Sequence, residues 1–205
     1  MVTAPELEPF DGELEQEGDY ELVSFAGADL SEGQAQDARF LDCVLDGANL
    51  DEARLDRAHL IDTAITACHA GTLHAPDGHW RDVTVRDCRL GAVQAHGGVL
   101  TRVTITGGKL DYLNLRGARV ERMRLVGVTI GDLDLSTARV AGLVLEDCRV
   151  RRLDVQGATL RDVDLRGAEL SRIDGPAGLK GARISEQQLL ELAEVFAAHL
   201  GVTVG

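Results

Sequence analysis

Residues 131–170 read GDLDLSTARVAGLVLEDCRVRRLDVQGATLRDVDLRGAEL, and every fifth residue of this stretch, beginning at Leu135, is apolar. The residue two places before each of these positions is apolar as well. The pattern extends outward into two columns of 31 sites, one from Tyr20 to Leu170 and one from Val23 to Ile173. None of these sites is charged, although a random draw at the chain's 27% of charged residues would contain about 17 charges. A repeat this regular decides the fold before any local motif is considered.

The five-residue period fits neither of the common secondary structures, because a helix repeats apolar residues at i, i+3, i+4 and i+7 and a strand alternates them. Within each unit the two apolar residues are spaced as in a strand, where alternate side chains point the same way. The pattern then restarts with the same inward orientation, which requires the chain to turn a corner in every unit. Four corners close a square, so about four units form one coil, and neighbouring coils pair their backbone groups at about 4.8 Å. The sequence therefore predicts a solenoid around a dry core, whose leucines include Leu50, Leu115, Leu135, Leu145 and Leu165.

The repeated units resemble the A(D/N)LXX pattern of the pentapeptide-repeat family, with good matches at Ala28-Asp29-Leu30, Ala48-Asn49-Leu50 and Ala168-Glu169-Leu170. The resemblance covers about 155 of the 205 residues. It implies an all-β fold, namely a right-handed quadrilateral parallel β-helix of about eight coils and roughly 35–40 Å in length. We expect this β-helix over residues 20–174.

The net charge of −13 lies in the N-terminal part of the chain. Residues 1–60 contain 16 Asp and Glu against 3 Arg, whereas residues 61–205 contain 18 acidic and 18 basic residues. Residues 1–19 combine acidic residues with Pro5 and Pro9 and carry little apolar content. This composition predicts an acidic, partly flexible N-terminal arm.

The cysteines and the absence of long apolar runs indicate the compartment. Cys43, Cys68, Cys88 and Cys148 all fall in the inward column that begins at Val23, so we expect buried thiols. A Cys68–Cys88 disulfide is sterically open, but a reducing cytosol would keep both as thiols. No apolar run approaches about 18 residues and no signal-peptide pattern is present, so the sequence predicts a cytoplasmic protein.

Residues 175–205 are expected to form a capping and dimerisation element. The spacing predicts one α-helix over residues 185–200, with Ser185 as N-cap and Gln188 as its capping-box partner. Its apolar stripe would cover the last open coil and offer a surface for a homodimer joined at the C-terminal ends. The stripe contains Leu189, Leu192, Phe196 and Leu200.

One stretch inside the repeat, residues 71–80, departs from the pattern of its neighbours. Its inward neighbours Ala70 and Ala75 are small, and Pro76 removes a backbone donor. We expect a kink, a bulge or a protruding loop there.

Two groups of polar residues recur at the twenty-residue spacing of one coil. His59 and His79 would stack on one face, where two imidazoles could bind a metal ion, although surface histidines without a ligand are far commoner. The second group is a ladder that could carry out acid–base chemistry or, in the commoner case, hydrogen-bond turn amides. The ladder consists of Asn114, Asp134, Asp154 and Asp174.

No phosphate-binding glycine loop, nucleophile elbow or zinc-ligand spacing is present, so the sequence predicts neither an enzyme nor a cofactor. Two functions stay open. One is a protein-interaction scaffold without nucleic-acid or membrane binding. The other follows from the resemblance, because relatives include fluoroquinolone-resistance proteins that mimic DNA and bind DNA gyrase or topoisomerase IV as acidic dimeric rods. The neutral, arginine-rich distal coils disfavour this second function, since a C-terminal dimer would place them at its centre.

Overall fold

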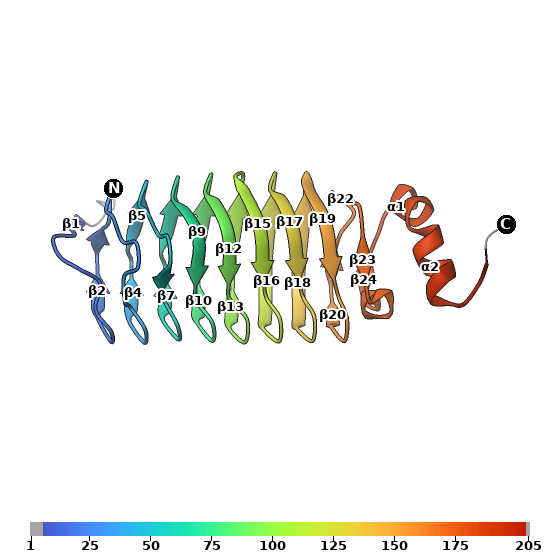
Figure 1. Cartoon of the computed structure of the whole chain (residues 1–205), viewed down its shortest axis with the longest axis horizontal. Coiled ribbons are helices and arrows are strands. Elements are labelled where there is room, and N and C mark those ends of the chain that lie inside the picture. The colour runs from blue at the N-terminus through green and yellow to red at the C-terminus, as the bar shows by residue number, and fades with distance from the viewer. Residues whose placement is uncertain (1–5, 204–205) are drawn as a thin grey trace, which may run out of the picture.

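The computed structural model describes residues 6–203, which form a rod of stacked coils with two short helices at its C-terminal end (Figure 1). Within residues 19–174 each coil contains twenty residues, so positions twenty apart lie side by side in neighbouring coils, as His79 does with His59 and Val99. The rod has about eight coils of parallel strands. The prediction of a parallel β-helix is therefore confirmed.

Each coil has four faces, which we number in chain order from the face that contains Tyr20. The first face carries β2 (Asp19–Glu21), β4 (Arg39–Leu41), β7 (His59–Ile61), β10 (His79–Arg81), β13 (Val99–Thr101) and β20 (Thr159–Arg161). The second face carries β1 (Glu8–Pro9), β3 (Val23–Ser24), β5 (Val44–Asp46), β8 (Ala64–Thr66), β11 (Thr84–Arg86), β14 (Thr104–Thr106), β21 (Val163–Asp164) and β24 (Ala182–Arg183). Two longer strands turn the corner between these faces, β16 (Arg119–Val126) and β18 (Arg139–Glu146).

The third face carries the second sheet, which continues around the corner toward the fourth face. Its strands are β6 (Ala53–Arg54), β9 (His69–His74), β12 (Arg89–Gln94), β15 (Lys109–Asn114), β17 (Thr129–Asp134), β19 (Cys148–Asp154), β22 (Ala168–Leu170) and β23 (Ile173–Asp174). The fourth face is made largely of extended residues and turns. Leu135 on this face still bonds to the next coil, because its N–H donates to the carbonyl of Asp154 at 2.8 Å.

The chain turns most of its corners through residues in the left-handed conformation, which follow a five-residue spacing that is interrupted within the long strands of the third face. Examples are Asp77 (φ 56°), Asp82 (φ 57°) and Gly97 (φ 71°). Glycine has no Cβ, and aspartate carries a short polar side chain, so both residues tolerate positive φ better than most. The need for positive φ at these positions explains why Gly and Asp occupy so many corners. The sequence analysis did not predict this spacing of left-handed residues.

The two apolar columns line one continuous core. Thr63, a polar member of the columns, is 1% exposed and donates its hydroxyl to the Ile61 carbonyl at 3.0 Å. The hydroxyl therefore satisfies its hydrogen bond inside the core. The five leucines that the sequence predicted to lie in the core are each 1% exposed, namely Leu50, Leu115, Leu135, Leu145 and Leu165.

The four cysteines are buried free thiols. Each lies close to backbone carbonyls of its own coil and of the preceding coil, as Cys43 does with Leu41 at 3.5 Å and Tyr20 at 3.3 Å. Burial raises the pKa of the Cys43 and Cys148 thiols, because the thiolate is poorly solvated in the core. These cysteines therefore act as small apolar residues in the packing.

The expectation of a kink, bulge or loop over residues 71–80 is wrong. β9 and β10 pair in register with both neighbouring coils, and Ala75 is completely buried. Pro76 fits because its turn position does not donate to the ladder between coils. The equivalent N–H of Gln156 bonds to the Asp154 side chain instead, at 2.9 Å. Proline therefore removes no inter-coil bond at this position.

The N-terminal segment also differs from the prediction of an arm; residues 1–5 of that prediction lie outside the described residues. From residue 6 the chain lies against the first coil, where β1 pairs with β3. The Phe10 ring packs with its centroid 4.5 Å from that of Phe25, and Leu14 is 8% exposed. Phe10 and Leu14 cover the N-terminal end of the core, which would otherwise be exposed to solvent. This burial explains why the acidic segment packs against the first coil and does not extend into solvent.

The C-terminal end contains the 3₁₀ helix η1 (Pro176–Leu179) and two helices, α1 (Glu186–Glu191) and α2 (Ala193–His199), instead of the predicted single helix. The break falls at Leu192, which is 2% exposed. The predicted stripe is divided by this break: Phe196 is half-buried, whereas Leu189 and Leu200 are exposed. No helix within residues 6–203 is long and apolar enough to cross a membrane.

Gln188 joins this end to the last coil, and its predicted capping box with Ser185 is confirmed. Its side chain is almost completely buried, and its Nε2 donates to the carbonyls of Leu165 at 2.7 Å and Ala168 at 2.6 Å. In earlier coils the carbonyls equivalent to that of Ala168 accept from the backbone of the next coil, as that of Val128 does from the Arg149 N–H at 3.0 Å. Gln188 thus takes the place of a missing coil.

Candidate functional site

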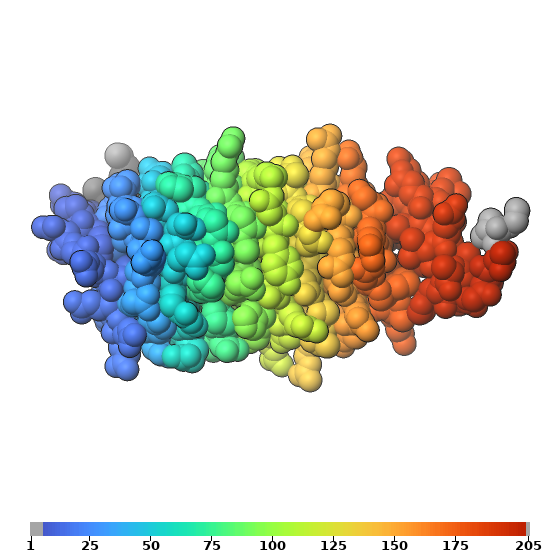
Figure 2. Space-filling model, viewed as in Figure 1, coloured from blue at the N-terminus to red at the C-terminus, as the bar shows by residue number. Residues whose placement is uncertain are grey.

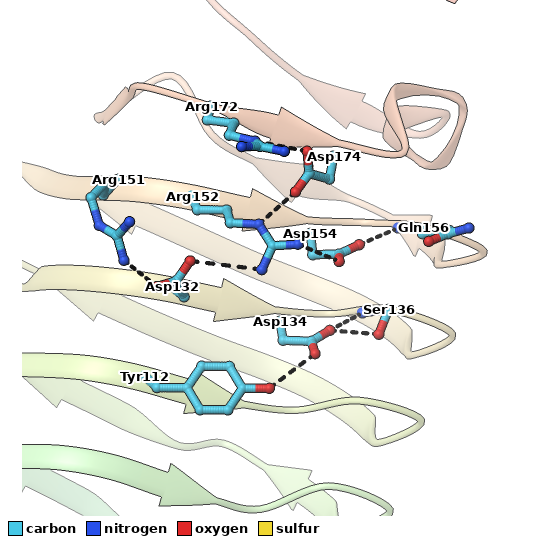
Figure 3. Close-up of polar contacts among 10 residues, drawn as sticks. All are labelled: Tyr112, Asp132, Asp134, Ser136, Arg151, Arg152, Asp154, Gln156, Arg172 and Asp174. Atoms are coloured by element: carbon cyan, nitrogen blue, oxygen red, sulfur yellow. Dashed lines mark hydrogen bonds and ion pairs between the residues drawn. The ribbon is translucent and has the colours of Figure 1, made fainter.

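The polar ladder lies where the strands of the third face end. Asn114, Asp134, Asp154 and Asp174 are Cα partners in four successive coils. Figure 3 shows three of these aspartates one above another beside the arginines of neighbouring columns. The twenty-residue spacing therefore brings together all four side chains of the predicted ladder.

The ladder side chains bond to the turns that follow them. Asp134 accepts from the Ser136 N–H at 2.8 Å, and Asp154 accepts from the Gln156 N–H at 2.9 Å. Asn114 accepts in the same way from the next turn, at 3.1 Å from the Arg116 N–H. These contacts favour the turn-capping interpretation of the ladder over the acid–base one.

Arg152 connects the distal part of the ladder. Its guanidinium donates to Asp154 at 3.2 Å and to Asp174, and it lies 3.8 Å from Asp132 (Figure 3). Arg151 also pairs with Asp132, and Arg172 donates to Asp174 at 2.9 Å. The sequence predicted the ladder but not its contacts with Arg152 and Asp132, although these two residues share one column at the same twenty-residue spacing.

The network also lowers the pKa of the Asp174 carboxyl group. The Arg152 guanidinium, hydrogen-bonded to Asp174, holds the pKa of this carboxyl below its usual range. A lowered folded-state pKa stabilises the fold above the unfolded pKa of aspartate, and this contribution is lost as the pH falls through the folded pKa. An ionised, paired carboxylate is a poor proton donor at neutral pH, so this cluster supports the rod surface rather than proton transfer.

Replacing Arg152 with methionine should raise the pKa of Asp174 toward its ordinary value, because the strongest hydrogen bond to the carboxylate is removed. Carbon-detected NMR titration of the carboxyl resonance would measure the change. Arg151→Met is the matched control, since Arg151 contacts Asp132 and not Asp174. An Asp174 pKa that is unchanged in Arg152→Met would contradict the assignment.

The histidines do not assemble into a metal centre within residues 6–203, where no group of three or more His, Cys, Asp or Glu is placed to hold an ion. His59 and His79 do stack, with ring centroids 4.7 Å apart and an angle of 10° between the planes. His74 lies elsewhere, 2.9 Å from Glu52. The predicted stacking is therefore present, and the ring pair lies on the first face.

The exposed large apolar side chains of the described residues gather at the C-terminal end of the rod. Leu190 is 77% exposed and Leu200 75%, and both belong to the helical cap. Leu189 and Val202 are also more than half exposed. We call these four residues the apolar end.

Charge is separated along the rod. Figure 2 shows the surface from the N-terminal end, drawn in blue, to the C-terminal end, drawn in red. The acidic excess of residues 1–60 belongs to the blue end, whereas acidic and basic residues balance in the rest of the chain. Many distal charges are paired, as Arg124 is with Glu146 at 2.9 Å and Arg149 with Glu169 at 3.0 Å.

Comparison with known proteins gives a family match and several similar solved structures. A family model described as pentapeptide repeats matches residues 24–60 in eight copies. No curated protein matches the chain at a significant level. HetL from the cyanobacterium Nostoc sp. strain PCC 7120, a pentapeptide-repeat protein involved in heterocyst differentiation regulation, is 23% identical over 87% of this chain and 77% of its own, with a TM-score of 0.30.

Two structures of QnrB1, a plasmid-mediated fluoroquinolone resistance protein, are also similar. A trypsin-treated variant is 16% identical over 96% of both chains, with a TM-score of 0.40. The full-length protein is 12% identical over 92% of this chain and 99% of its own, with a TM-score of 0.34. The pentapeptide-repeat model thus matches residues 24–60, and the same five-residue register continues through the rod as far as Leu170.

Proposed function

We propose that this protein is a non-catalytic cytoplasmic scaffold whose outer faces bind other proteins. The observation that carries the proposal is the rod itself, which holds outward side chains at a fixed spacing of about 4.8 Å on a rigid core. A partner protein can bind such a preformed surface without any rearrangement of the backbone. The paired carboxylates of Asp154 and Asp174 favour a binding surface over an acid–base site.

Affinity capture tests the scaffold. The immobilised protein should retain a protein from cell extract, and that protein, once purified, should give a saturable isotherm with the solenoid in calorimetry. The fold-matched control is a variant with several outward residues reversed in charge and the core unchanged. Failure of every retained protein to bind in purified form would reject the scaffold function.

We also propose that two copies join through the apolar end. A twofold axis beyond the C-terminus would place Leu190 and Leu200 of one copy against those of the other, which is a self-complementary contact. Clustered exposed leucines are unusual on a monomer and mark association surfaces. The acidic N-terminal ends would then lie far apart at the two tips, where their mutual repulsion is smallest.

Leu190→Glu should convert the dimer to a monomer at micromolar concentration, because two buried carboxylates would face each other without partners. Light scattering coupled to size exclusion measures the mass directly. Glu186→Gln, on the same helix, serves as a control and should leave the dimer intact. A wild-type protein that is monomeric at all concentrations would disprove the interface.

An alternative partner is DNA gyrase or topoisomerase IV, with the rod acting as a DNA mimic of the fluoroquinolone-resistance type. The acidic N-terminal coils and the sequence pI of about 4.8 favour it. The distal coils disfavour it, since they are neutral and would lie at the centre of the proposed dimer. A gyrase supercoiling assay with added protein tests this alternative. If micromolar protein neither inhibits the enzyme nor protects it from the drug, DNA mimicry is rejected.

A further inference from the structure

Three arginines on the distal first face make no ion pair with a carboxylate of the described residues 6–203. Arg119 and Arg139 are Cα partners in neighbouring coils, and Arg161 lies one coil further on the adjacent outward column, opposite Ala141. All three are exposed. Within residues 6–203, no ion pair of 4.0 Å or less joins any of them to Asp or Glu. We call them the arginine row.

Other arginines of the same coils do have carboxylate partners. In the same coils Arg124 pairs with Glu146 on the second face, and Arg151 pairs with Asp132 near the ladder. Like charges directly opposite each other on neighbouring strands are destabilising. Two arginines stacked at strand spacing therefore form a surface that an external anion would stabilise.

The arginine row borders a shallow groove of about 300 Å³. Ala141 contributes its floor, because its short side chain lies between the longer side chains of Glu121 and Arg161 in the same column. Thr159 adds a hydroxyl beside Arg139. The groove thus combines cationic walls, a small apolar floor and a neutral hydrogen-bonding group.

We propose that this groove binds an acidic polypeptide segment of a partner protein, a proposal that rests on the scaffold function. Carboxylates fit the planar guanidinium fork, which donates two parallel N–H bonds to one carboxylate. The row spans only three coils, or roughly 10 Å at strand spacing, which matches two or three carboxylates of a short segment.

The charge of the rest of the molecule selects a short peptide over a nucleic acid. A polynucleotide that followed the first face along the rod would run from the arginine row toward the acidic coils of residues 1–60. A short acidic segment avoids those coils, since exposed charges are largely screened beyond about 8 Å at physiological salt. Glu121, at the N-terminal edge of the groove, limits the occupant on that side.

Binding of a labelled glutamate-rich peptide, followed by fluorescence anisotropy at about 20 mM and about 150 mM NaCl, tests the groove. Arg139→Glu should weaken binding about tenfold, because one attraction becomes one repulsion. Arg119→Glu/Arg139→Glu should abolish it. Glu121→Gln should strengthen it, a gain that a merely damaged fold cannot produce.

Arg89→Glu is the matched control, since Arg89 is an exposed arginine on the third face and makes the same change in net charge. Equal losses in Arg89→Glu and Arg139→Glu would overturn the groove in favour of non-specific charge attraction. No binding by the wild type, or tighter binding of a single-stranded oligonucleotide of equal charge, would overturn it too.

The two levels of the proposal fail in different ways. If the scaffold function is right and the groove wrong, the partner retained in affinity capture would still bind Arg119→Glu/Arg139→Glu as it binds the wild type. If the scaffold function is wrong, no captured protein would bind in purified form, while the acidic peptide would still distinguish Arg139→Glu from Arg89→Glu.

Discussion

Leu135→Asp is expected to abolish cooperative folding at neutral pH. Leu135 is 1% exposed and lies in the fourth-face column between Leu115 and Val155. Removing a buried leucine side chain costs about 2–5 kcal/mol, and an unpaired carboxylate adds several more. The total approaches the entire stability of an ordinary domain, roughly 5–15 kcal/mol.

Circular dichroism at increasing temperature measures the effect of Leu135→Asp. The matched change is Leu135→Met, which conserves volume and should cost less than about 1.5 kcal/mol. Wild-type melting of Leu135→Asp would place this column on the surface and would invalidate the register of the whole solenoid.

Gln188→Leu is expected to destabilise the C-terminal end by roughly 1–3 kcal/mol, since a buried carbonyl left without a donor costs about that much. The carbonyl of Ala168 accepts from Gln188 Nε2 and would lose this donor, whereas the carbonyl of Leu165 also accepts from the Ala168 N–H at 3.0 Å. Leucine fills similar space but donates nothing. Urea unfolding, followed by circular dichroism, would report the change as a lower midpoint.

Gln187→Leu provides the comparison. Gln187 is exposed and bonds only to the Glu191 side chain at 2.8 Å, a contact between residues four apart that contributes a few tenths of a kcal/mol. Its midpoint should stay close to that of the wild type. Equal midpoints for Gln187→Leu and Gln188→Leu would mean that the amide does not replace a missing coil.

The repeat could be predicted from sequence because each inward position is decided locally. A charged residue in place of Leu115 or Leu145 would be buried within its own coil, independently of distant parts of the chain. The absence of charge at these positions therefore identifies the residues of the core. The ladder of Asp134, Asp154 and Asp174 followed from the same twenty-residue arithmetic. These features need only periodicity.

The two ends could not be derived in this way, because they depend on contacts outside the repeat. Phe10 and Leu14 lie in an acidic segment with no period, and only the open core beside them makes their burial favourable. The helix break at Leu192 has a similar origin, since this residue turns into the core while Leu189 stays exposed. The expectation of a kink at Pro76 was wrong because a missing N–H weakens a strand only where that N–H pairs with a neighbouring strand. Pro76 lies in a turn, where the N–H makes no such bond.

The constant twenty-residue coil restricts how such a chain can change in length. Adding or deleting one residue within a coil would exchange the inward and outward side chains of the units that follow, unless the extra residue loops out at a corner. An insertion of five, ten or fifteen residues keeps the core intact but moves each later surface column onto a different face, and between Arg119 and Arg139 it would separate these two residues. Only duplication or loss of a whole coil lengthens or shortens the rod and leaves every surface row in line.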